Sequence, residues 1–252
     1  MRIFTTLSAG LLAAVLLAPA GSAQGAATQS TAPVAKADAE ETGHLTFAID
    51  RDGNQIGTHR IAFRRSGDRL TVKVAIDIEV GLGPIPLYTY THRNTTTWRN
   101  GHLMAMDTTT DDNGEEFFVK ARRTDDGRLA VETRDGRRTV AGDLLPSTYW
   151  MTATAEASRL LNTQKGGVDA VTIAPKGRKP VALPGGGEVE AQGYDMDGGI
   201  DADIWYAPDG RLVGLKFTAR GATVRYDLIE LSGVVPTQPP QSAAAGRGAD
   251  SG

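Results

Sequence analysis

Apolar and polar residues alternate along many stretches of the chain, most regularly between Arg69 and Val80. There the even-numbered positions are leucine, valine or isoleucine, and the odd-numbered positions are polar, charged or small. Because successive side chains of a strand point to opposite faces of the sheet, this stretch predicts a long strand with one buried and one solvated face. Related patterns predict further strands at Leu45–Ile49, Ile61–Phe63, Leu87–Trp98, Leu103–Thr110, Phe117–Arg123, Leu129–Thr133, Val168–Ala174, Val181–Leu183, Val189–Met196, Ile200–Tyr206, Arg211–Thr218 and Ala222–Leu231.

Short turns separate these strands. Asn100-Gly101, Asp126-Gly127 and Pro208-Asp-Gly210 are examples, and such pairs favour tight hairpins because both residue types tolerate positive φ. Strands joined in this way form a meander. We therefore predict a mainly β fold, a curved antiparallel meander sheet or half-barrel, with one short helix plugging it.

The predicted helix lies in the middle of the chain, after Leu144-Leu-Pro-Ser-Thr-Tyr-Trp150. Thr152 or Thr154 can cap its start, and Gly166 and Gly167 can end it. Its apolar face is predicted from the helical spacing of Ala153, Ala157, Leu160 and Leu161.

Pro146 sets a turn before two adjacent large rings, Tyr149 and Trp150. With the helix, the rings form an apolar plug over the open end or concave face of the sheet. A plug of this kind either closes the core or acts as a lid over a ligand. We favour core closure, because aromatic side chains mostly serve burial.

Three sets of stretches carry a family resemblance. They are Ile56-Gly-Thr-His-Arg60 with Tyr88-Thr-Tyr-Thr-His-Arg93 and Trp98, Leu145-Pro-Ser-Thr-Tyr-Trp150 with Leu160-Leu-Asn-Thr-Gln164, and Asp203-Ile-Trp-Tyr206 with Gly210-Arg-Leu-Val-Gly-Leu-Lys-Phe217. Together they resemble the exported bacterial family known as Domain of Unknown Function 6134, over most of residues 44–231. The resemblance implies a β-rich, half-barrel-like fold and brings no activity with it.

The ends of the chain differ in composition from its middle. Residues 1–23 are predicted to be a secretory signal cut after Ala23, because a short apolar run ends at the small residues Gly21-Ser-Ala23. Residues 24–42 and 232–252 are predicted to be a disordered spacer and a disordered tail, which leaves one domain at 43–231. We therefore expect a protein exported to the periplasm of a Gram-negative bacterium, or secreted, with no transmembrane segment.

The composition excludes several kinds of catalytic and binding site. The chain has no cysteine, which removes thiol catalysis and thiolate metal sites. Its net charge is −3 with a pI near 5.8, and no basic stripe points to nucleic acid. We expect no cofactor and no metal. The oligomeric state is left open.

Candidate ligand-binding residues are Tyr88, Tyr90, His92 and Trp98, together with the plug residues Tyr149 and Trp150. The first four share one face of a predicted strand, where rings and a few polar groups could line a ligand cavity. The partner would be a lipid or another amphipathic small molecule. The competing interpretation is cross-strand packing on a sheet face.

Two alternatives to a binding protein stay open. One is a hydrolase that uses His92 or His59 with an aspartate such as Asp107, although Ser147 has no nucleophile elbow around it. The other is a structural or assembly module of the envelope. The carboxylates of Asp195-Met-Asp-Gly-Gly-Ile-Asp-Ala-Asp203 suit calcium, but a solvated hairpin is favoured, with Asp201 and Asp203 on its wet face.

Overall fold

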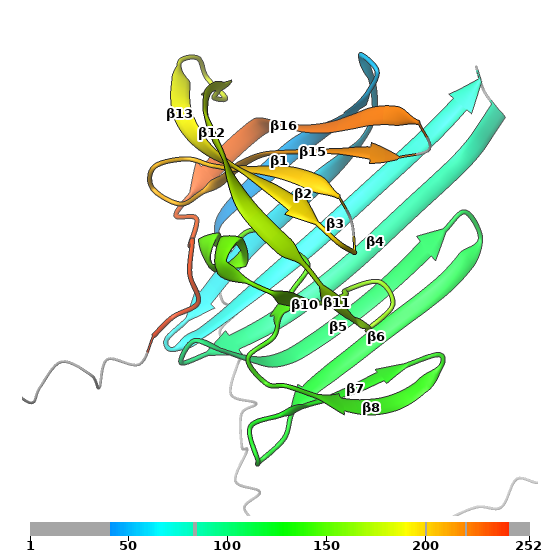
Figure 1. Cartoon of the computed structure of the whole chain (residues 1–252), viewed down its shortest axis with the longest axis vertical. Coiled ribbons are helices and arrows are strands. Elements are labelled where there is room, and N and C mark those ends of the chain that lie inside the picture. The colour runs from blue at the N-terminus through cyan, green and yellow to red at the C-terminus, as the bar shows by residue number, and fades with distance from the viewer. Residues whose placement is uncertain (1–40, 83–84, 200, 220, 242–252) are drawn as a thin grey trace, which may run out of the picture. The chain divides into compact units, whose positions relative to one another are not determined.

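The computed structural model describes residues 41–82, 85–199, 201–219 and 221–241. Within them one sheet has thirteen strands, in the order β12-β13-β14-β15-β16-β1-β2-β3-β4-β5-β6-β7-β8 (Figure 1). Its first part consists of β1 (Glu41–Arg51), β2 (Asn54–Ser66), β3 (Arg69–Leu82), β4 (Ile85–Arg99), β5 (His102–Asp112), β6 (Glu115–Arg123), β7 (Leu129–Thr133) and β8 (Gly136–Val140). The rest consists of β12 (Thr172–Ala182), β13 (Glu188–Asp197), β14 (Ala202–Tyr206), β15 (Leu212–Ala219) and β16 (Ala222–Gly233).

The pairing pattern is a meander in two halves. Neighbours along the chain pair antiparallel within β1–β8 and within β12–β16, and the halves join where β16 pairs with β1. The sheet order ends at β12 and β8, so among the described residues the sheet stays open. The prediction of a mainly β, antiparallel, half-barrel-like fold is confirmed.

A second, three-stranded sheet connects the two halves. It consists of β9 (Leu145–Pro146), β10 (Arg159–Leu161) and β11 (Val168–Ala170), and β9 runs parallel to β10. Between β9 and β10 lies one 3₁₀ helix, η1 (Thr152–Glu156).

The predicted α-helix with its face at Ala153, Ala157, Leu160 and Leu161 is wrong in kind and extent. Ala157 is already extended, with ψ of 139°, and no side chain caps η1 at Met151. Leu160 and Leu161 belong to the strand β10, because backbone pairing with β9 and β11 replaces the hydrogen bonds of a helix. Both side chains are buried. The expected single short helix therefore exists as one 3₁₀ element.

The plug is confirmed by its contacts with both halves. The Trp150 ring meets Phe63 of β2 edge to face at 5.4 Å and Trp98 of β4 at 6.1 Å between centroids. The Tyr206 hydroxyl of β14 reaches the backbone oxygens of Tyr149 and Met151, at 2.8 and 3.0 Å. The segment thus lies against inward-facing residues of β2, β4 and β14.

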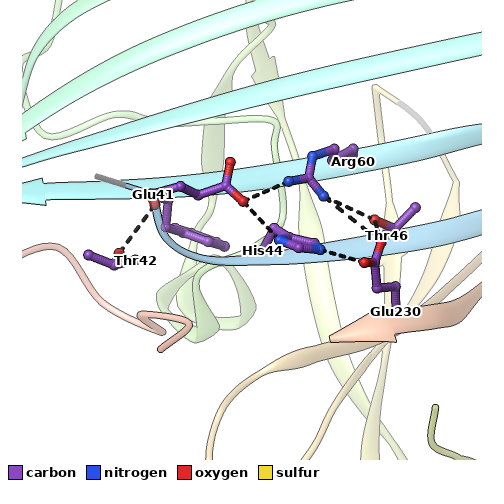
Figure 2. A network of polar contacts seen from close by, with 7 residues as sticks. Glu41, Thr42, His44, Thr46, Arg60 and Glu230 are labelled. Atoms are coloured by element: carbon purple, nitrogen blue, oxygen red, sulfur yellow. Dashed lines mark hydrogen bonds and ion pairs between the residues drawn. The ribbon is translucent and has the colours of Figure 1, made fainter. Parts of the chain in front are cut away.

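On the outward side, a polar network ties β1 to its two neighbours (Figure 2). The imidazole of His44 lies between two carboxylates, with Nδ1 2.8 Å from Glu41 and Nε2 3.0 Å from Glu230. Arg60 of β2 pairs with Glu41 at 2.6 Å, and Thr46 donates to Glu230 at 3.0 Å. The network therefore spans the junction at which the first and last strands meet.

Two predicted boundaries need correction. Glu41 and Thr42, placed in the spacer, belong to β1. Beyond residue 231 the chain stays packed, since Val234 N donates to Thr42 O at 2.7 Å and Pro240 accepts from Gly101 N at 2.6 Å. Backbone bonds of this kind extend a fold past the end of its apolar pattern. The signal, most of the spacer and the rest of the tail lie outside the described residues.

Candidate functional site

The inward face of β4 changes from apolar to polar side chains along the length of the strand. Trp98, at one end, is 1% exposed and packs on Trp150. Toward the other end the inward residues are Asn94, His92 and Tyr90. From Tyr90 to Arg99, each β4 residue has a fixed neighbour on β3 and on β5, so the change from apolar to polar side chains can extend across these three strands.

A ladder of polar pairs joins β4 to β5 on this face. His92 Nδ1 lies 2.8 Å from the Thr110 hydroxyl, and the Asn94 amide donates to the Thr108 hydroxyl at 2.7 Å. Both pairs are buried and directly opposed in register. Buried polar groups ordinarily find partners in this way, so we interpret these pairs as structural, although Asn94 Oδ1 has no partner among the described residues.

The open end of the ladder contacts the plug. Tyr90 donates to Gln164 at 3.3 Å, and the Gln164 amide lies 3.4 Å from Asp112, which also accepts from Tyr88 at 2.8 Å. The Tyr90 and His92 rings stack, with centroids 6.3 Å apart and 10° between their planes.

His59 of β2 lies in the same transverse row as His92, with Ile76 of β3 between them. Its ring is 5% exposed, and neither nitrogen has a hydrogen-bond partner among the described residues. The ring meets Tyr226 of β16 edge to face at 5.5 Å and Phe47 of β1 at 5.8 Å. A buried polar atom without a partner costs about 1–3 kcal/mol, so an unpaired imidazole needs an explanation.

Burial keeps these side chains uncharged near neutral pH. Desolvation lowers the pKa of His59 to about 3 and, with Arg93 nearby, that of His92 to about 4. Burial also raises the pKa of Tyr226, and the phenols of Tyr90 and Tyr149 raise it further. Tyr226 of β16 therefore interacts electrostatically with Tyr90 of β4 and Tyr149 of the plug, and its ring contacts His59.

Tyr149 is held in an unusual backbone conformation. Its φ of 58° lies in the left-handed region, where a bulky side chain is an outlier. Elsewhere in the described ranges, the non-glycine residues with positive φ are Asp52, Asn100 and Asn113, which are ordinary in turns. Tyr206 holds the strained turn through its hydroxyl contact with the Tyr149 carbonyl. Such strain costs on the order of 1–3 kcal/mol and tends to occur at functional sites.

The six predicted ligand-binding residues separate into two groups. Trp98 and Trp150 lie in the apolar core, each 1% exposed. The other four are Tyr88, Tyr90, His92 and Tyr149, and they lie at the polar end of the inner face. His59 and Tyr226 complete that group, and sequence reasoning did not place them together. Val224, Tyr226 and Leu228 occupy every second position of β16 and share its buried face, and this alternation was the signal in the sequence that Tyr226 points inward.

The prediction that Asp107 could pair with His92 or His59 in a hydrolase site is wrong. That side chain lies on the exposed face of β5, in an ion pair with Arg122 at 2.6 Å. His59 and His92 are buried on the other face. The Ser147 hydroxyl lies 3.3 Å from the Thr163 hydroxyl and accepts a hydrogen bond from the Thr163 backbone N–H at 3.1 Å.

The carboxylate stretch at 195–203 forms the β13–β14 hairpin, with Asp195 opposite Asp203. The prediction that Asp201 and Asp203 both face solvent is wrong for Asp203, which is only 9% exposed and pairs with Lys176 of β12. Asp201 is exposed. Among the residues that the structure describes, no three histidine, aspartate or glutamate side chains gather as a metal site would require.

Two surface hollows lie away from the His59 group. One, of about 510 Å³, lies over the β6–β8 edge and is lined by residues such as Lys120, Arg122 and Arg137. The other, of about 480 Å³, lies beside η1 and Tyr194. Neither hollow is lined by His59, His92, Tyr90 or Tyr226. No helix in the described part of the chain is both long and apolar enough to cross a membrane.

Comparison with known proteins supports the fold and the family. The crystal structure of a β-barrel-like protein of domain of unknown function DUF1849 from Brucella abortus superimposes with a TM-score of 0.55 at 14% sequence identity. The match covers 77% of this chain and 98% of that one, and at this identity it concerns the fold alone. None of the curated proteins matches. A family model matches residues 47–229, so the chain belongs to the family described as domain of unknown function DUF6134.

Proposed function

We propose that this chain is an exported, non-catalytic binding protein that holds an uncharged amphipathic small molecule at the polar end of its inner face. The observation that carries the proposal is His59, a buried imidazole whose nitrogens both lack a partner within the part of the chain that the structure describes. It lies against Tyr226 and in the same row as His92. A ligand hydroxyl or carbonyl group would satisfy the imidazole.

The chemistry of the group suits such a ligand. Neutral imidazole offers one donor and one acceptor, and the phenols of Tyr90, Tyr149 and Tyr226 offer further hydroxyls. With the histidines uncharged, a formal charge on the ligand would lie buried without a counter-ion, at a cost of several kcal/mol. The apolar surfaces of Phe47 and Ile76 suit the ligand's hydrocarbon part.

Entry requires side chains to move, because both His59 nitrogens are closed off from solvent. The contacts of Gln164 with Tyr90 and Asp112 are long, at 3.3 and 3.4 Å, and only partly buried. The strained Tyr149 sits in the same plug. These contacts between plug and sheet are the ones we propose to open. The signal pattern at residues 1–23 supports export to the periplasm.

Mass spectrometry of organic extracts from protein purified out of the cell envelope tests the proposal. We expect a neutral amphipathic compound at near-stoichiometric yield in the wild type. The Tyr226→Phe and His59→Phe variants should lose it, and an Ile229→Ser variant on the outward face should retain it. Equal yields in all four proteins, or no compound in a folded wild type, would contradict the proposal.

A further inference from the structure

Strands β3 and β4 continue past both of their neighbours. Pairing of β2 with β3 begins at Gly57 and Ile78, and pairing of β4 with β5 stops at Tyr90 and Asp112. Beyond these points Val80–Leu82 and Ile85–Tyr88 pair only with each other in the described sheet. We call these two segments the β3–β4 arm (Figure 1).

The arm exposes apolar side chains. Ile85 is 60% and Leu87 63% exposed, the latter at an irregularity in the register between Val80 and Gly81. Pro86, between them, is exposed as well. No aspartate, glutamate, lysine or arginine occurs in the sequence between Glu79 and Arg93. Exposed aliphatic side chains in a segment that has no charged residue of its own suit a surface that meets an apolar partner.

We propose that the β3–β4 arm contacts the surface of a lipid bilayer, where the amphipathic ligand is taken up or released. The order of residues along β4 supports this. Ile85 and Leu87 come first, then the amphipathic rings of Tyr88 and Tyr90, then the buried His92. Tyrosine favours the boundary between lipid and water, so the strand leads from an interfacial segment into the proposed ligand site.

The small size of the arm favours lipid over a protein partner. A standard protein interface buries roughly 800 Å² on each side with a shaped, well-packed centre. Two aliphatic side chains at the end of a two-stranded arm supply only part of such a surface. A bilayer requires no complementary shape and accepts a few inserted aliphatic groups.

Co-sedimentation with phosphatidylcholine vesicles tests the inference, using the chain as purified from the cell envelope. We expect the wild type to sediment with vesicles at low and high salt alike, because the arm carries no charge. The Ile85→Asp/Leu87→Asp variant should bind at least ~10-fold more weakly, since two aliphatic groups leave the lipid. Ile229→Asp is the matched control, because Ile229 is 50% exposed on β16, and it should bind like the wild type.

Three results would overturn the inference. They are no sedimentation of the wild type, equal loss in the control, and cross-linking of the arm to a single envelope protein in place of lipid. The inference rests on the proposed ligand-binding function but has a separate readout. Vesicle binding reports on the arm and extracted ligand on the His59 group, so failure of one is distinguishable from failure of the other.

Discussion

The imidazole of His59 and the phenol ring of Tyr226 meet edge to face, 5.5 Å apart and at 87°, although they come from β2 and β16. Strand β1 lies between them in the sheet, and its pairing with both neighbours brings the first and last parts of the domain together. This contact places an unpaired polar ring within an aromatic environment. The proposed function depends on it.

Loss of the hydroxyl should destabilise the fold at Tyr206 but have little effect at Tyr226. Tyr206→Phe removes the contacts with the Tyr149 and Met151 carbonyls and should lower the free energy of unfolding by about 1–3 kcal/mol. Tyr226→Phe is the matched control and should change it by less than about 0.5 kcal/mol, because its hydroxyl bonds to none of the described residues. Urea denaturation measures both, and equal losses would show that Tyr206 does not hold the plug.

Trp150 should anchor the plug. Trp150→Ala removes a ring that is 1% exposed and packed on Phe63 and Trp98, so we expect a loss on the order of 3–5 kcal/mol. Trp150→Phe should retain most of that stability. A loss below roughly 1 kcal/mol for the alanine variant, from chemical denaturation, would remove the plug from the account.

Acid should destabilise the fold through the buried histidines. The pKa values of His59 and His92 are about 3 and about 4 in the folded chain, against 6.5 as the ordinary value. The unfolded chain therefore binds more protons below pH 6.5, and stability present above that pH falls as the pH decreases toward 4 and then 3. By pH 5 each histidine should have lost about 2 kcal/mol of stabilisation.

Denaturation series between pH 7 and pH 5 measure this slope. His59→Phe should flatten it, and His102→Gln, on the exposed part of β5, is the control. A slope identical in the wild type and in His59→Phe would mean that the imidazole is not buried as described.

The outward network around His44 should contribute little by comparison. The hydrogen bonds from His44 and Thr46 lower the pKa of the Glu230 carboxyl, and the carboxyl is fully exposed. Exposed ion pairs contribute little to stability and weaken with salt. Glu230→Gln should therefore shift the urea midpoint only slightly, and less at 1 M salt. A large, salt-independent shift would give the network a structural role that this account denies it.

The sequence predicts most of the sheet, because apolar and polar residues alternate along strands that have one buried face. It misses β8, whose residues Gly136–Val140 lack apolar alternation since four of them are exposed. It splits β12, where Pro175 and Pro180 suggest breaks. Both are edge strands, and proline is tolerated there because one side of the strand needs no donor.

Two other features escape sequence reasoning for a different reason. The helical spacing of Ala153, Ala157, Leu160 and Leu161 also fits a 3₁₀ turn followed by a buried strand, and pairing with β9 and β11 decides between them. The contact of His59 with Tyr226 depends on β16 pairing with β1. No local pattern specifies a pairing between the two ends of a domain, so half of the candidate site could not be assembled in advance.

The nitrogen NMR signals of the His59 imidazole test the central claim most directly. We would label histidine in protein stripped of its ligand and return the extracted compound. The account predicts that the His59 ring nitrogens shift on addition, as a hydrogen bond to the ligand forms, while those of His102 stay unchanged. Binding of the compound with no change at His59 would contradict the claim that this imidazole holds the ligand.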